Sequence, residues 1–86
     1  MGNYSITFAK SARKELESLD AIFVCRILSK IESLAFDPRP KGLRKLKGEE
    51  NLWRIRVGNY RVVYYVKDKE KIVDIVEVRH RKDVYR

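Results

Sequence analysis

Apolar residues follow a helical spacing in the first part of the chain and an alternating spacing in the second. The alternating sequence NYSITF predicts a first strand over residues 3–8. Ser11 is placed to cap a short helix, and Asp20 to cap a longer one. The buried stripe of the longer helix is expected to contain six residues, namely Val24, Ile27, Leu28, Ile31, Leu34 and Ala35.

The period changes to two after the sequence DPRPKG, whose two prolines are expected to end the second helix. LRKLK, residues 43–47, predicts a short strand or an extended loop, and further strands are predicted at 52–57, 60–66 and 72–79. A Gly-Asn pair between the first two of these strands predicts a two-residue hairpin turn. The β-α-α-β-β-β order predicts an α+β fold, in which two N-terminal helices cover one face of a twisted antiparallel sheet.

The predicted hairpin WRIRVGNYRVVYY, residues 53–65, contains three arginines, Arg54, Arg56 and Arg61. With a Gly-Asn turn, Arg56 lies opposite Arg61, and residues that pair across two strands share a face. All three arginines are then expected on the face away from the helices. They form either a phosphate site, since guanidinium forks suit phosphate oxygens, or ion pairs with Asp74 or Glu77 of the next strand.

Charge is distributed unevenly along the 86 residues, whose net charge is +8. Five basic and five acidic residues balance as far as Pro38, whereas fifteen basic and seven acidic residues follow from Arg39 onward. The whole excess of positive charge therefore belongs to the second part. This asymmetry predicts a polyanionic partner, most simply nucleic acid, although surface charge for solubility is the alternative explanation.

Several classes of protein are disfavoured by the composition. The single cysteine, Cys25, excludes an internal disulfide and is expected to be a buried, inert thiol among apolar neighbours. One histidine, one cysteine and no carboxylates at ligand spacing predict that the protein binds no metal and needs no cofactor. Without a long apolar run or a signal peptide, we expect one cytoplasmic domain over residues 1–86 that does not enter the membrane.

Four passages, in this order, resemble the RelE/ParE superfamily of bacterial and archaeal toxins: SARKELESL, DPRPKGLRKLKG, LWRIRVGNYRVVYYV and VEVRHRKDVY. The resemblance extends over essentially the whole chain. It implies a RelE-like α+β fold and a toxin that is paired with a partly disordered antitoxin. RelE-like members of the superfamily cleave mRNA in the ribosomal A site, whereas ParE-like members poison DNA gyrase.

The resemblance also implies which residues act in catalysis. In RelE-like nucleases these are basic groups on the first hairpin strand, an arginine that opens the second strand, an arginine after the last strand and a tyrosine near the C-terminus. The best-known nuclease has lysines at the first two positions, and some relatives use a loop glutamate that PRPKG lacks. The matching residues here are Arg54, Arg56, Arg61, Arg81 (with Arg79 as the alternative) and Tyr85.

Cleavage of RNA by its own 2′-hydroxyl requires charge stabilisation, which these arginines supply, and proton transfer, for which arginine is poorly suited. Lys47, Glu49 and Glu50 are candidates for the proton transfer. His80 is either an acid–base group or a packing residue, and Tyr85 either stacks on a base or belongs to a frayed end. Four basic residues are expected to contact the RNA backbone, namely Lys45, Lys47, Arg79 and Lys82.

Together with these residues, the resemblance implies a metal-independent, ribosome-dependent mRNA endonuclease, the toxin of a type II toxin–antitoxin pair. The alternatives are a ParE-like gyrase inhibitor and a noncatalytic module that binds RNA or the ribosome. The expected partners are the ribosome, mRNA and an acidic, partly disordered, RelB-like antitoxin that forms a hetero-oligomer with the toxin. That antitoxin is expected either to cover Arg54, Arg56 and Arg61 or to displace the C-terminal RHRKDVYR segment.

Overall fold

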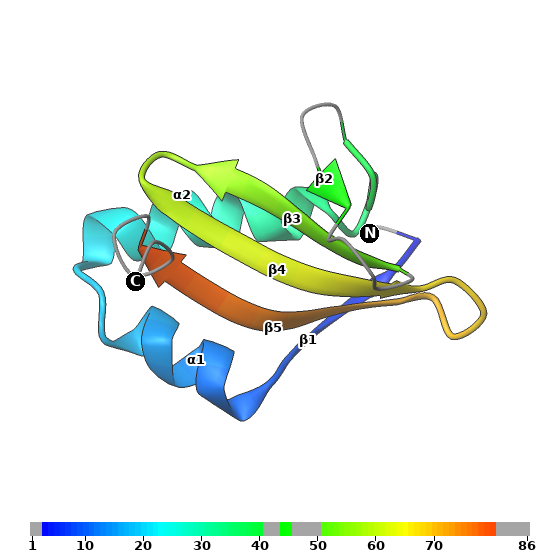
Figure 1. Cartoon of the computed structure of the whole chain (residues 1–86), viewed down its shortest axis with the longest axis horizontal. Coiled ribbons are helices and arrows are strands. Elements are labelled where there is room, and N and C mark those ends of the chain that lie inside the picture. The colour runs from blue at the N-terminus through cyan, green and yellow to red at the C-terminus, as the bar shows by residue number, and fades with distance from the viewer. Residues whose placement is uncertain (1–2, 41–43, 46–50, 81–86) are drawn as a thin grey trace.

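The elements follow one another in the predicted order. The computed structural model describes residues 3–40, 44–45 and 51–80. In chain order, the elements are β1 (Ser5–Phe8), α1 (Lys10–Glu17), α2 (Ala21–Ser33), β2 (Arg44–Lys45), β3 (Leu52–Val57), β4 (Tyr60–Lys67) and β5 (Ile72–His80), as Figure 1 shows. The α+β class is confirmed, as is the β-α-α-β-β-β order of the longer elements, and the two-residue β2 adds a short strand within the predicted 43–47 segment.

The strands form one sheet in the order β1-β5-β4-β3-β2. The pairs β2–β3, β3–β4 and β4–β5 are antiparallel, but β1 runs parallel to β5. The sheet is therefore mixed, whereas the sequence had predicted a wholly antiparallel one. Ser5 lies beside Ile72 in this parallel pair, although 67 residues separate them along the chain. Parallel neighbours need a long connection between them, and here the helices and the hairpin supply it.

The core lies between the helices and the inner face of the sheet. Ile27, Ile31 and Leu34 carry the apolar stripe of α2 into it and are almost completely buried. They meet buried strand residues that alternate along β4 and along the first part of β5, as the period of two predicted. In β5 the alternation shifts by one residue between Ile75 and Val78, where an irregularity in the ladder leaves Val76 without a partner on β4. The fully buried members on the strands are Val62, Tyr64, Val66, Val73, Ile75 and Val78.

The helix starts were predicted only in part. Asp20 is the N-cap residue of α2, as expected, but its side chain makes no capping hydrogen bond. The prediction of Ser11 as the cap of α1 is wrong, because α1 begins at Lys10 with Ala9 as its N-cap. The backbone N–H of Ala9 donates to the carbonyl of Ile75 at 2.8 Å, so β5 fixes this position and the helix starts directly after the strand.

The prediction of a buried Cys25 is also wrong, because this cysteine is exposed. It follows Val24 by one residue, which turns its side chain about 100° around the helix axis, away from the apolar stripe. Two large apolar residues at the start of α2, Ile22 and Phe23, are exposed as well. Within the described residues, neither α1 nor α2 is long and apolar enough to cross a membrane.

Candidate nucleic-acid interface

The β3–β4 hairpin has the predicted register. Arg56 lies opposite Arg61, and Val57 lies opposite Tyr60 at the end of the ladder. Gly58 adopts a φ of +60°, a backbone conformation that residues other than glycine rarely adopt and that two-residue hairpin turns require. The turn therefore fixes which residues share a face along the whole hairpin.

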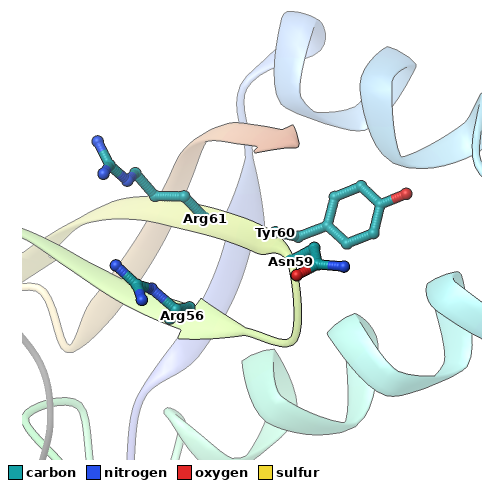
Figure 2. Close-up of a pocket in the computed structure, with 4 residues that line it drawn as sticks. All are labelled: Arg56, Asn59, Tyr60 and Arg61. Atoms are coloured by element: carbon teal, nitrogen blue, oxygen red, sulfur yellow. The ribbon is translucent and has the colours of Figure 1, made fainter. Parts of the chain in front are cut away.

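The two arginines nearest the turn point away from the helices. Figure 2 shows Arg56 and Arg61 extending in the same direction from neighbouring strands, while Tyr60 extends toward the helices. Arg56 is exposed and Arg61 is partly exposed, and both line a shallow pocket together with Asn59 and Tyr60. Their buried neighbours, such as Ile55, face the core. The predicted division of the hairpin into an arginine face and a core face is confirmed.

The carboxylates of β5 do not neutralise these two arginines. Glu77 forms an ion pair with Arg79, with 3.0 Å between Oε1 and Nε, and Asp74 accepts a hydrogen bond of 2.8 Å from the hydroxyl of Thr7. Among the described residues, neither Arg56 nor Arg61 has an ion-pair partner. Two guanidinium groups thus face each other across the ladder, which destabilises the hairpin in the absence of an anion.

Arg79, the third arginine at this end of the sheet, has carboxylate partners. It pairs with Arg61 in the strand register. Its Nε lies 3.0 Å from Glu77 and 3.6 Å from Oε1 of Glu15 on α1. Arg79 therefore links β5 to α1, and an RNA phosphate would compete with two carboxylates for it.

His80 does not join the arginines. It lies opposite Tyr60 in the register, and the two rings meet edge to face with 5.0 Å between their centroids. Tyr60 in turn contacts Phe23 of α2 at 5.5 Å. The structure thus places His80 on the helix side of the sheet, a position that suits the packing role.

Several predicted site residues are only partly described or are not described. The backbone of Lys45 pairs with that of Trp53 in the β2–β3 ladder. The other candidates that lie outside the described residues are Lys47, Glu49, Glu50, Arg81, Lys82 and Tyr85.

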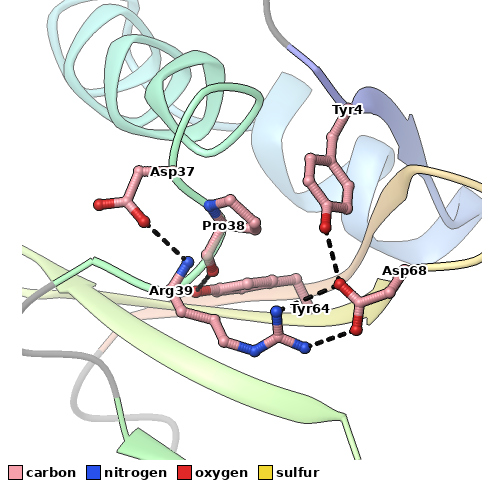
Figure 3. A network of polar contacts seen from close by, with 6 residues as sticks. All are labelled: Tyr4, Asp37, Pro38, Arg39, Tyr64 and Asp68. Carbon is pink, nitrogen blue, oxygen red and sulfur yellow. Dashed lines mark hydrogen bonds and ion pairs between the residues drawn. The ribbon is translucent and has the colours of Figure 1, made fainter.

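A polar cluster at the other end of the sheet had no counterpart in the sequence predictions (Figure 3). Asp68, in the β4–β5 turn, accepts hydrogen bonds from Arg39 at 3.2 Å to Oδ1 and 2.9 Å to Oδ2. The hydroxyl of Tyr4 donates to the same Oδ1 at 2.7 Å. Because 29 and 64 residues separate these partners, no local pattern in the sequence could have indicated the cluster.

The hydrogen bonds of this cluster alter the acidity of its members. The hydrogen bonds from Arg39 and then from Tyr4 lower the pKa of Asp68 to about 2. Donation to that carboxylate raises the pKa of Tyr4, and the same carboxylate raises the pKa of Arg39. Nearby, burial raises the pKa of Tyr64, whose hydroxyl donates to the carbonyl of Pro38 at 2.8 Å.

No metal site accompanies these groups in the part of the chain that the structure describes. There, no three histidine, cysteine, aspartate or glutamate side chains lie close enough together to hold an ion. The described region instead offers permanent positive charge. The guanidinium groups of Arg56 and Arg61, without an ion pair among the described residues, lie on an exposed face of the sheet and suit phosphate oxygens.

Known proteins are similar to this chain in sequence and in fold. The family described as "ParE toxin of type II toxin-antitoxin system, parDE" matches residues 6–85. Toxin RelG of Mycobacterium tuberculosis is 31% identical over 88 residues, which cover 96% of this chain and 97% of the relative. Putative toxin RelE1 of Methanocaldococcus jannaschii is 28% identical over 86 residues, which cover 96% of each chain.

Solved structures of toxins are similar to this chain as well. A chain of the archaeal RelE–RelB complex from Pyrococcus horikoshii superposes with a TM-score of 0.82 at 32% identity, over 92% of this chain and 96% of that chain. The isolated RelE toxin of Escherichia coli superposes with a TM-score of 0.81 at 28% identity, over 95% of this chain and 90% of that chain. The chain therefore belongs to the RelE/ParE toxin family of type II toxin–antitoxin systems.

Proposed function

We propose that this toxin inhibits translation by cleaving mRNA in the ribosomal A site, with the RNA's own 2′-hydroxyl as the nucleophile and without a metal ion. The observation that carries the proposal is the arrangement of Arg56 and Arg61. They lie opposite each other on an exposed face, and no carboxylate within the described residues neutralises them. Two permanently charged guanidinium groups at paired positions suit the extra negative charge that a pentacovalent phosphorane develops.

The arginines account for only one part of the reaction. Arginine cannot readily be deprotonated, so another group has to move the protons. Lys47, Glu49 and Glu50 precede the hairpin in the sequence, and Arg81 and Tyr85 follow β5. We propose that groups from these two segments complete the site and that the ribosome aligns the scissile phosphate, since in-line geometry supplies much of the rate.

A cytoplasmic, acidic antitoxin of the RelB type is the proposed partner. Relatives of this chain have been solved in RelE–RelB complexes. The surplus of positive charge after Arg39 favours an inhibitor that brings a negatively charged segment to that part of the toxin. We propose a toxin–antitoxin hetero-oligomer in which this segment shields Arg54, Arg56 and Arg61 from RNA.

Inhibition of DNA gyrase is the second candidate function. It is favoured by one specific observation, namely that the family matching residues 6–85 is described by its ParE toxins. A gyrase inhibitor needs a binding surface but no catalytic residues, and an exposed cationic face would also serve that purpose.

The order in which cellular processes stop separates the two functions. The toxin should be induced alone in a bacterial host while incorporation of labelled amino acid and labelled thymidine is followed. We expect growth to arrest, translation to stop before DNA synthesis, and mRNA on ribosomes to be cut. If DNA synthesis fails first while the mRNA stays intact, the nuclease proposal is wrong and the gyrase function is favoured.

A further inference from the structure

Glu77 of β5 lies on the same face of the sheet as Arg61. The register pairs Glu77 with Val63 and Arg79 with Arg61, and residues that pair across two strands share a face. Val78, which follows Glu77 directly, belongs to the core, so the side chain of Glu77 points to the opposite face. The exposed fraction of that side chain is 38%. A solvent-accessible carboxylate therefore lies on the arginine face.

The diagonal neighbour of Glu77 across the β4–β5 ladder is Arg61. Side chains at diagonal positions of an antiparallel pair begin about 7–8 Å apart. Because both side chains are long, the carboxylate of Glu77 can reach the ribose next to a phosphate that Arg61 holds. Among the described residues, no other carboxylate occupies a ladder position next to Arg61. Glu77 is thus the acidic side chain that the sheet brings to the cationic site.

Arg79 orients this carboxylate and leaves part of it available. Its Nε lies 3.0 Å from Oε1 of Glu77 and 3.6 Å from Oε1 of Glu15, and the second contact holds Arg79 against α1. Within the part of the chain that the structure describes, Oε2 of Glu77 takes part in no hydrogen bond or ion pair. One oxygen of the carboxylate is therefore fixed, and the other is available to accept a proton.

We propose that Glu77 is the general base of RNA cleavage, a catalytic residue that takes the proton from the 2′-hydroxyl. This inference rests on the proposed nuclease function, which requires a group other than arginine to move the protons. A glutamate side chain is ordinarily ionised at neutral pH and is able to act as a base.

The reaction balances with water as the only other reactant. As Glu77 takes the proton, the 2′-oxygen forms a bond to phosphorus and the bond from phosphorus to the 5′-oxygen breaks. The 5′-oxygen takes a proton from water, and the hydroxide that remains takes the proton back from Glu77. The products are a 2′,3′-cyclic phosphate and a 5′-hydroxyl, and the carboxylate is regenerated.

Glu77→Gln tests the proposal, because the amide keeps the size of the side chain but cannot act as a base. We expect the single-turnover rate of cleavage of ribosome-bound mRNA to fall about 10²-fold, as for the loss of a general base. The matched control is Glu15→Gln, which removes the same charge and the other carboxylate partner of Arg79. That variant should cleave at the wild-type rate. If both variants lose activity equally, Glu77 acts only through Arg79 and the proposal is overturned.

The pH dependence of the cleavage rate distinguishes a base from a structural partner. The charged side chains around Glu77 and its partner include Arg79 and Asp74 on β5, Arg61 on β4, Arg54 on β3 and Glu15 on α1. Between about pH 6 and pH 9 the wild-type rate should be nearly constant, whereas Glu77→Gln has to rely on hydroxide and its rate should rise with pH. Glu77→Asp keeps a carboxylate and should keep the flat profile at a lower rate. Parallel profiles for the wild type and Glu77→Gln would overturn the proposal.

The wild-type toxin separates a failure of this inference from a failure of the proposed function. If the wild type cleaves ribosome-bound mRNA and Glu77→Gln cleaves it at the same rate, Glu77 is not the base although the toxin is a nuclease. If the wild type leaves the mRNA intact, the nuclease function and this inference are both refuted. Glu77→Gln and Glu77→Asp should retain the circular dichroism of the wild type, because the side chain lies outside the core.

Discussion

Arginines at the two ends of this sheet have opposite surroundings. Arg39 shares a carboxylate with Tyr4 and lies over an indole ring, whereas Arg56 and Arg61 lie opposite each other without a carboxylate partner in the described region. The residue type is the same, and the difference comes from what occupies the neighbouring positions. Near Arg39 the β4–β5 turn supplies Asp68, while the partner across the ladder from Arg56 is another cation.

The comparison separates a structural arginine from one that is available for binding. A guanidinium group that already donates two hydrogen bonds to a carboxylate gains less from a phosphate, because it must first give up those contacts. Arg56 and Arg61 have no such contacts to lose within the described residues, and an anion between them would relieve their repulsion. Binding function is therefore expected at the Gly58 end of the hairpin and structural support at the Asp68 end.

The largest expected effect is the loss of activity in Arg61→Ala. Cleavage of ribosome-bound mRNA should fall on the order of 10²-fold or more, by analogy with the loss of one donor from an oxyanion site. The fold should persist, because Arg61 points away from the core, as Figure 2 shows. Cleavage rates together with circular dichroism test this prediction, and a variant that cleaves at the wild-type rate would exclude Arg61 from the site.

The next effect concerns association with the antitoxin. The association rate should fall about tenfold or more from low to high ionic strength, because salt screens the attraction between an acidic segment and the arginine face. Arg61→Gln should weaken this salt dependence more than Arg13→Gln, which removes the same charge from α1. Stopped-flow binding tests the expectation. A rate that is indifferent to salt, with exchange protection confined to α1 and α2, would show that the antitoxin binds the helix side.

The hairpin and its two faces could be predicted because local rules determine them. A Gly-Asn turn fixes the register, and a period of two then assigns every side chain to one face or the other. The same local logic gave the apolar stripe of α2 from Val24 to Leu34, whereas Ala35, also expected in it, lies beyond the end of the helix and is not part of the core. It misplaced Cys25, because cysteine is usually buried, whereas the position of this residue on the helix turns it away from the apolar stripe.

The features that sequence reasoning missed depend on contacts between distant segments. The parallel pairing of β1 with β5 joins residues such as Ser5 and Ile72, and nothing in the first strand indicates its partner. The Arg39–Asp68 pair likewise joins two polar stretches that each resemble an ordinary turn. Ladder neighbours within one hairpin can be inferred from the sequence, whereas contacts between remote loops depend on how the whole chain packs.

Acid stability provides a test at the Asp68 end. The pKa of Asp68 is lowered to about 2 in the folded protein from an ordinary value of 3.8. Its contribution to stability is therefore fully present above the ordinary pKa and is lost as the pH falls toward 2. Asp68→Asn cannot titrate, so the difference in the free energy of unfolding between wild type and this variant should narrow over that range.

Urea unfolding at a series of pH values measures that difference. The hydrogen bonds from Arg39 are the main cause of the lowered pKa of Asp68. When both proteins also carry Arg39→Lys, the difference in their free energies of unfolding should therefore disappear at a higher pH. A difference that stays constant from pH 4 to pH 2 would mean that Arg39 and Tyr4 do not hold the carboxylate of Asp68 in its charged form.

The smallest expected effect is on the free energy of unfolding, which should rise when an arginine without a carboxylate partner is replaced and fall when an ion-paired arginine is replaced. Arg61→Gln removes a charge that faces Arg56 directly and should raise the free energy of unfolding by about 0.2–1 kcal/mol in the free toxin. Arg13→Gln removes a charge that pairs with Glu17 and should lower it by about 0.3–0.5 kcal/mol. Equilibrium unfolding at low salt gives both values, and added salt should bring both toward zero. If Arg61→Gln instead destabilises the protein, Arg61 has a structural partner in the free toxin, and the contrast between the two ends of the sheet fails. If Arg61→Gln is more stable than the wild type but no longer cleaves mRNA, the repulsion between Arg56 and Arg61 lowers the stability of the free toxin and serves to bind an anion.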